Sequence, residues 1–151
     1  KEHLFKAVIT QAADEFAQRM TRVRAEAAGD SHQQLTLFMT AYAGFMGDPF
    51  VRSIFRLVMA ERPRFPELAM QFFERGRTDF GGVLMQALQR LAAAGELQVT
   101  KPAWAAGQLM GMIEHPIFFV PLVTGDEVLA KRAQAQIAED AVQTFLARYG
   151  R

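Results

Sequence analysis

The stretch PFVRSIFRLVMAERPRFPELAMQFFERG, residues 49–76, contains two helix-like patterns that meet at a charged corner with two prolines. On both sides of the corner, apolar residues recur every three or four positions, as they do on a helix with one buried face. Pro63 prevents the first helix from continuing, and Pro66 suits the first position of the second. We therefore predict a solvated bend between two helices, with Phe65 tucked toward the core, rather than a catalytic or anion-binding loop.

The rest of the chain shows the same helical periodicity and almost no strand pattern. Alternating apolar runs bounded by Asn-Gly or Asp-Gly turns do not occur. Asp30 or Ser31, and later Asp48, are predicted N-caps because their side chains can accept a backbone N–H hydrogen bond. We predict one all-α domain over residues 1–151 with about six helices, the fifth from about Pro102 to Val123 and the sixth from about Glu127 to Tyr149.

The composition excludes some kinds of chemistry and leaves others open. Seventeen basic and 16 acidic residues give a formal net charge of +1, without the basic excess typical of a nucleic-acid-binding domain. The chain has no cysteine, so neither a disulfide nor a thiolate is available. Its 13 phenylalanines and eight methionines indicate either an ordinary aromatic-rich core or a core with a cavity. The chain begins at Lys1 inside a helical pattern, so we expect a fragment of a longer protein.

Residues 103–123 form the most membrane-like stretch. A spanning helix needs about 20 apolar residues with few or no charges. Here Glu114, His115 and Pro116 lie near the middle. We therefore predict a buried helix of a bundle rather than a membrane span.

The last two predicted helices carry more apolar surface than one partner requires. Ala103, Gly107 and Gly111 form a ladder of small residues that would let another backbone approach closely. The sixth helix is apolar over about half its circumference, which exceeds the roughly 100° stripe of a singly packed helix. We predict a two-fold dimer with a four-helix interface, with packing inside the monomer alone as the alternative. The predicted interface residues are Trp104, Gly107, Gly111, Glu114, Phe118, Ile137, Ala138, Ala141 and Phe145.

No constellation typical of an enzyme or a metal site occurs. His3, His32 and His115 lie in three different segments, and neither a Gly-rich phosphate loop nor a nucleophile elbow is present. Glu114 and His115 form the one polar pair in apolar surroundings. They could be a polar handle in a ligand pocket, a hydrogen-bonded pair at a helix kink or dimer seam, or groups of a cofactorless enzyme. We predict no enzymatic activity, no metal and no cofactor.

The stretch at 49–76, followed by LQRLAAAGELQV at 88–99, resembles the C-terminal domain of TetR/AcrR-type transcriptional regulators, and the AefR-like subgroup is closest in pattern. KEHLFKAV at 1–8 resembles the segment where such proteins leave their DNA-binding domain. The resemblance implies a cytoplasmic, homodimeric regulator, usually a repressor, with an N-terminal helix-turn-helix. No helix-turn-helix lies in residues 1–151, so operator DNA would be bound only through a domain before Lys1.

The resemblance also implies a small, mostly apolar ligand inside the helical domain, and the first helix as the transmitter of the signal. A pocket between helices with a few polar groups is a common small-molecule site. The alternative is a helical dimerisation or carrier module without a transcriptional role. The residues predicted to line the pocket are Phe16, Met20, Phe38, Tyr42, Phe45, Phe55, Met59, Phe73, Phe80, Leu84, Met112 and Ile113.

Overall fold

A computed structural model describes residues 1–151, and the chain is helical apart from short connections. Two of the helices contain a π-helical turn, so ten segments form six continuous helices. The predicted all-α fold is confirmed, and the one β pairing is an isolated bridge between Leu97 and Gly150. The segments are α1 (Glu2–Glu26), α2 (Ser31–Met46), α3 (Pro49–Glu61), α4 (Pro66–Gly76), η1 (Arg77–Gly82), α5 (Val83–Ala93), α6 (Pro102–Glu114), η2 (His115–Phe119), α7 (Val120–Val123) and α8 (Gln134–Tyr149).

Local sequence sets the helix starts. The Asp30 side chain accepts a hydrogen bond from the Gln33 backbone N–H at 2.9 Å, and the Gln33 side chain accepts one from the Asp30 N–H at 3.0 Å. This reciprocal pair is a capping box at the start of α2. Asp48 caps α3 by accepting from the Phe50 N–H at 2.8 Å. Pro66 opens α4 at its first position, so the predicted N-caps and the proline corner are confirmed.

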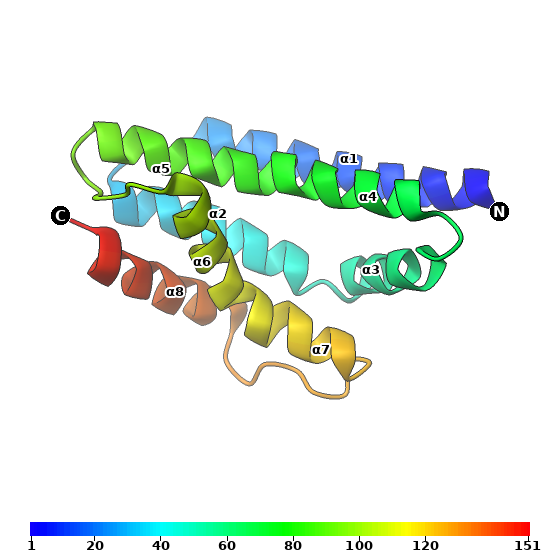
Figure 1. Ribbon diagram of the computed structural model, residues 1–151. Helices are drawn as coiled ribbons and strands as arrows, with labels where there is room; N and C mark the ends of the chain where they lie inside the picture. The colour runs from blue at the N-terminus through cyan, green and yellow to red at the C-terminus, as the bar shows by residue number, and fades with distance from the viewer.

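The six helices form a layered bundle (Figure 1). Two long rods, α1 and the continuous helix α4–η1–α5, run side by side across one face. Below them, α2 and α8 pack along each other, and the helix α6–η2–α7 crosses obliquely beside them. The short α3 lies near the N-terminal end of α1, and the C-terminus lies at the opposite end of the molecule.

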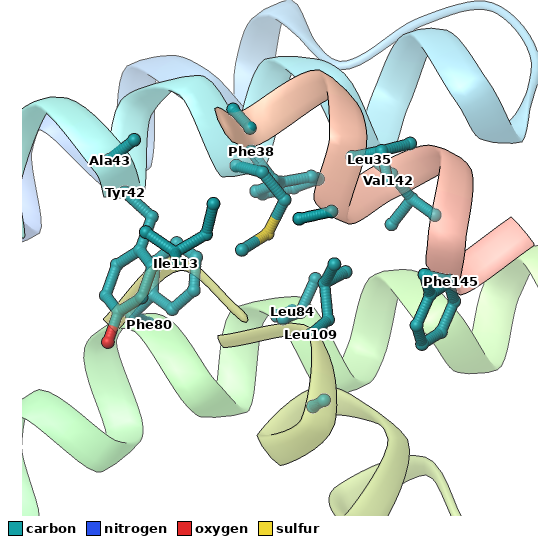
Figure 2. Packing of buried hydrophobic residues seen from close by; sticks show 14 of the residues in the cluster. Leu35, Phe38, Tyr42, Ala43, Phe80, Leu84, Leu109, Ile113, Val142 and Phe145 are labelled. Carbon is teal, nitrogen blue, oxygen red and sulfur yellow. The ribbon is translucent and has the colours of Figure 1, made fainter. Parts of the chain in front are cut away.

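Buried side chains form two clusters of different size. The larger cluster lies where α2, α5, α6 and α8 meet, and Figure 2 shows Phe38, Leu84 and Leu109 packed within it. The smaller cluster joins the first half of α1 to α3, and no residue of α4 is fully buried. One end of the bundle is therefore closely packed and the other is not. The smaller cluster consists of Phe5, Ile9, Ile54 and Val58.

The sixth helix begins later than predicted. Residues 127–133 are not helical, and α8 starts at Gln134. The preceding turn holds Asp126 at a positive φ of 68°. Its carboxylate accepts hydrogen bonds from Arg52 Nε at 2.6 Å and from Arg56 Nη1 at 3.2 Å. Because these contacts tie the turn to α3, the chain needs a connecting segment before it returns to α2 as α8.

Four of the predicted interface residues lie inside the chain's own core. The apolar stripe of α8 is buried because this helix packs lengthwise along α2. For α8 the structure therefore agrees with the alternative of packing within the monomer. The four residues are Ile137, Ala138, Ala141 and Phe145.

The helix α6–η2–α7 is long and apolar enough, by length and composition alone, to cross a membrane. In this fold it packs against α2, α5 and α8 instead. Only 28% of its most apolar window is buried, so much of its apolar surface faces outward. This outer face is described with the candidate site below.

Candidate ligand-binding cavity and outer helical face

A cavity of about 830 Å³ lies between the two packed regions of the bundle. Its wall comes from α1, α2, α3, α4, η1, the start of α5, α6 and η2, so five of the six continuous helices contribute. Most of the lining is apolar, and eight of its residues are aromatic. The aromatic residues are Phe16, Tyr42, Phe45, Phe55, Phe72, Phe73, Phe80 and Phe118.

The aromatic wall is held together by ring contacts. Tyr42 and Phe80 stack with centroids 4.1 Å apart and an interplanar angle of 14°, and their rings lie against each other in Figure 2. Phe55 makes edge contacts with Phe72 at 5.0 Å and with Phe118 at 4.7 Å. Because such pairs add about 0.5–1.5 kcal/mol beyond burial, they keep the wall in one arrangement around the cavity.

Small residues and a widened helical turn make the space. The π-helical turn η1 interrupts the helix α4–η1–α5 where it faces the cavity, and π turns inside α-helices are frequent at functional sites. A Cβ added at Gly81 would meet only Met110 Sδ, at 4.0 Å, and one at Gly76 would meet nothing within 4 Å. Gly76 and Gly81 therefore leave cavity volume beside this helix.

One hydrogen bond places a charged group on the apolar wall. The Tyr42 hydroxyl donates to Glu114 Oε1, which joins α2 to the end of α6. Burial, and then the negative charge of Glu114 beside it, raises the pKa of Tyr42 far above its usual range. Tyr42 therefore stays a neutral donor, and Glu114 is the acceptor. His115 does not share this bond; it is exposed and stacks on Phe119 with centroids 5.9 Å apart.

A second polar contact connects the wall to α1. Arg75 donates to Asp14 Oδ1 at 2.5 Å, and its Nε lies 3.4 Å from Asp79 Oδ2. Asp79 lines the cavity, and its Oδ2 is buried without a hydrogen-bond partner. The hydrogen bond that Arg75 donates to Asp14 is the main reason that the pKa of Arg75 is raised. Arg75 thus bridges α1 and the π turn.

The cavity opens beside the corner between α3 and α4. Met59 and Phe73 line it while 52% and 60% of their surfaces remain exposed. Arg62, the exposed residue that follows α3, stands at the same rim. The predicted solvated bend is thus also the edge of the cavity, with Phe65 turned inward against Phe5 at 5.7 Å.

Seven of the twelve residues predicted to line a pocket do line this cavity, and five do not. Phe38, Leu84 and Ile113 are fully buried in the larger cluster (Figure 2), where neighbouring helices fill the space around them. Met20 is also buried there, and Met112 lies on the opposite side of α6 beside Ile137. Contact of the remaining seven with a ligand stays a prediction: Phe16, Tyr42, Phe45, Phe55, Met59, Phe73 and Phe80.

Sequence analysis missed several wall residues. Gly107, Glu114 and Phe118, which are predicted only for a dimer interface, also line the cavity. Phe72 and Asp79 were not named as candidates. The spacing of Phe55, Met59 and Phe72 about the proline corner indicated a shared interior, whereas nothing in the sequence marked Asp79, whose position depends on the π turn.

The outer face of α6–η2–α7 carries exposed apolar side chains at helical spacing. Trp104 is 67% exposed, Phe119 53% and Val123 67%. A Cβ added at Gly107 or Gly111 would meet no atom of the chain within 4 Å. The fold of the single chain therefore does not need glycine at these two positions.

The structure brings together no metal-ligand set. No group of three or more His, Cys, Asp or Glu side chains is placed to hold a metal ion. His32 binds Glu139 at 2.7 Å, a contact between α2 and α8 that lies outside the cavity. The hydrogen bond from His32 is the main reason that the pKa of Glu139 is lowered. This pair joins two helices on the surface and holds no reactive group near the cavity.

Comparison with known proteins shows what this fold is similar to. The sequence profile of the family described as AefR-like transcriptional repressor, C-terminal domain, matches residues 33–151. No curated protein matches the sequence.

Solved structures share the fold at low sequence identity. A proposed TetR-family transcriptional regulator from Mesorhizobium loti is 24% identical, with 99% of this chain and 73% of that chain covered at a TM-score of 0.70. The flavonoid-responsive regulator FrrA is 24% identical, with 91% of this chain and 72% of that chain covered at a TM-score of 0.69. SmeT, the repressor of the Stenotrophomonas maltophilia multidrug efflux pump SmeDEF, is 16% identical, with 99% of this chain and 82% of that chain covered at a TM-score of 0.66.

Proposed function

Because the chain belongs to the AefR-like C-terminal-domain family of TetR-type transcriptional regulators, we propose that it is the ligand-sensing and dimerisation domain of a cytoplasmic repressor. The cavity of about 830 Å³ carries this proposal. Its size and its apolar wall with few polar groups are those of a small-molecule site. FrrA is flavonoid-responsive and SmeT represses a multidrug efflux pump. A flat aromatic molecule would suit the ring-lined wall of this chain.

The first helix is the proposed transmitter of ligand binding. Ala13 and Phe16 of α1 line the cavity, and Asp14 between them is held by Arg75. Arg75 also lies beside Asp79 on the π turn. A ligand that favours another position of the π turn would therefore shift the support of α1, since a ligand selects the conformation that it binds better. Through α1 the change would reach a DNA-binding domain before Lys1.

A homodimer is the proposed assembly, with the outer face of α6–η2–α7 as its interface. Trp104, Phe119 and Val123 expose apolar surface there, and Gly107 and Gly111 leave the backbone accessible between them. An exposed apolar stripe with small residues suits close packing against a second helix. The buried stripe of α8 is not part of this proposal.

Ligand binding is tested by filling the cavity. We expect flat aromatic compounds, with acridine as the first probe, to raise the melting temperature of the chain. Stabilisation of about 2.7 kcal/mol is expected at a ligand concentration 100 times the Kd. In Ala13→Trp the new ring occupies the cavity, and the shift should disappear. Ala7→Trp, at an exposed position of the same helix, should keep it. A shift that is unchanged in Ala13→Trp would place the ligand elsewhere.

Dimerisation is tested separately by light scattering after size exclusion. The chain should elute with twice its own mass, and Gly111→Arg should elute as a monomer with unchanged helical content. Gly44→Arg is the matched control, because a Cβ at Gly44 also meets no atom within 4 Å and the residue is exposed on α2. A monomeric wild-type chain at micromolar concentration would contradict this interface.

A further inference from the structure

Glu114 is a half-buried carboxylate on an apolar wall, and it has no cation beside it. Its Oε1 accepts the Tyr42 hydroxyl, its Oε2 accepts no hydrogen bond from the chain, and it forms no ion pair. A carboxylate partly withdrawn from water is destabilised unless an opposite charge or several donors compensate it. One neutral donor is partial compensation. The wall therefore offers an anionic group whose remaining partner is not supplied by the chain.

The other charged groups of the wall already have partners or lie in solvent. Arg77 binds Glu74 at 2.7 Å on an exposed face. Asp79 Oδ2 accepts no hydrogen bond, but it has an opposite charge beside it in Arg75, whose Nε lies 3.4 Å away. Arg62 is exposed at the rim, where water and salt screen its charge. Inside the cavity, the charge of Glu114 therefore favours a positively charged ligand.

The surroundings of Glu114 also favour a cation. Tyr42 and Phe80 present stacked rings beside it. Phe118 follows Glu114 by one turn on the helix α6–η2–α7. Aromatic faces attract cations, most strongly when both are removed from water. A flat aromatic ring can stack in the same place. The carboxylate and the rings together suit one kind of ligand: an aromatic ring system bearing a protonated nitrogen.

We propose, on the premise that the cavity is the ligand site, that it selects flat aromatic cations and that Glu114 determines this selection. The ligand's N–H donates to Glu114 Oε2, while Tyr42 continues to hold Oε1. The ring system lies among the phenylalanines of the wall. A neutral molecule of the same shape gains the stacking but leaves the carboxylate without its counter-charge.

Four probes of one shape separate charge from hydrogen bonding. They are 9-aminoacridine, a cation at neutral pH; acridine and a hydroxyacridine, both neutral; and acridine-9-carboxylate, an anion. In calorimetric titrations the wild-type chain should bind the cation at least about tenfold more tightly than acridine, and the anion most weakly. In Glu114→Gln the cation should fall to the affinity of acridine, while acridine itself is unchanged. Glutamine keeps an acceptor for the Tyr42 hydroxyl, so the wall is preserved.

Glu127→Gln is the matched control, because it removes an exposed carboxylate in the connection before α8 and should bind all four probes like wild type. Equal affinity of the wild type for the cation and acridine would overturn the charge proposal. So would a preference for the cation in Glu114→Gln as large as that of the wild type. Tightest binding of the hydroxyacridine or of the anion would overturn it as well. If acridine still binds and Ala13→Trp abolishes that binding, the cavity proposal survives such a failure. If none of the four binds, both proposals are contradicted.

Discussion

The two ends of this helical bundle are built from the same kinds of side chain and are packed differently. Where α2, α5, α6 and α8 meet, Phe38 and Leu109 are completely buried. Where α1, α3 and α4 meet, Phe72 and Phe73 face a cavity or solvent, and α4 has no fully buried residue. Phenylalanine content therefore does not decide packing density. What differs is the facing side: at one end neighbouring helices fill the space around each ring, whereas at the other Ala12, Ala13, Ala69, Gly76 and Gly81 border a cavity.

The largest expected effect comes from truncating one phenylalanine at each end. Phe38→Ala should lower the free energy of unfolding by about 3–5 kcal/mol, because it opens a hole in a filled core. Phe73→Ala removes the same atoms from a side chain that is 60% exposed at the cavity rim, and should cost about 1 kcal/mol or less. Urea denaturation followed by circular dichroism measures both.

Equal losses of unfolding free energy in the two variants would contradict the difference in packing between the two ends. They would mean that the cavity end is as closely packed in solution as the core. Because each variant removes one ring from a phenylalanine on a helix, helix propensity changes equally in both and cannot produce a difference.

Sequence reasoning predicted the helices well and the cavity wall only in part. Helix starts at Asp30, Asp48 and Pro66 follow from capping chemistry, which depends on neighbours a few residues away. Phe38 and Phe45 both lie on the inner side of α2, but only the second lines the cavity. That distinction depends on which residues of other helices face each ring. The apolar periodicity of one helix gives no information about those residues.

The same limit applies to the last helices. The excess apolar surface of α8 predicts an interface between chains, whereas in the structure α2 covers it within the chain. On α6, Glu114 fits a dimer seam and a cavity wall equally well by sequence; in the structure it lines the cavity and accepts a hydrogen bond from Tyr42 of α2. The π turn that places Asp79 has no sequence signal beyond its neighbouring glycines.

Adding volume should show the converse of truncation. Ala87→Leu, at a completely buried position of α5, should destabilise the chain by about 1–3 kcal/mol, because overpacking forces neighbours out of their rotamers. Ala13→Leu adds the same atoms toward the cavity and should be neutral or stabilising. Thermal unfolding of the pair measures the difference. A loss in Ala13→Leu as large as that in Ala87→Leu would show that α1 and α4 close on each other.

Alkaline pH should lower the free energy of unfolding through Tyr42, which lies at the boundary between the two ends. Because burial and Glu114 raise the pKa of Tyr42 in the folded chain, the hydroxyl keeps its proton there. An unfolded tyrosine loses its proton near pH 10. The stability due to Tyr42 is thus fully present below about pH 10 and is lost above it, by about 1.4 kcal/mol per pH unit.

Denaturation at several alkaline pH values checks this. In Tyr42→Phe the free energy of unfolding should fall less above pH 10, because the contribution of Tyr42 is absent. Tyr149→Phe leaves Tyr42 in place and should retain that contribution. A loss that is identical in wild type and Tyr42→Phe would mean that the hydroxyl is solvated rather than held against Glu114.

The smallest effect on stability is expected where the loosely packed end meets α1, and there signalling should change most. The side chains of Arg75 and Asp14 are 37% and 54% exposed, so Asp14→Asn should alter the free energy of unfolding by less than about 1 kcal/mol. In the intact regulator the same variant should reduce the ratio of operator affinities without and with ligand, because the π turn loses its charged link to α1. Glu15→Gln, on the exposed side of the same helix, should leave that ratio unchanged. Fluorescence anisotropy with labelled operator DNA measures the ratio. An unchanged ratio in Asp14→Asn would show that the signal leaves the cavity through the packing of Phe16 and its neighbours rather than through Arg75.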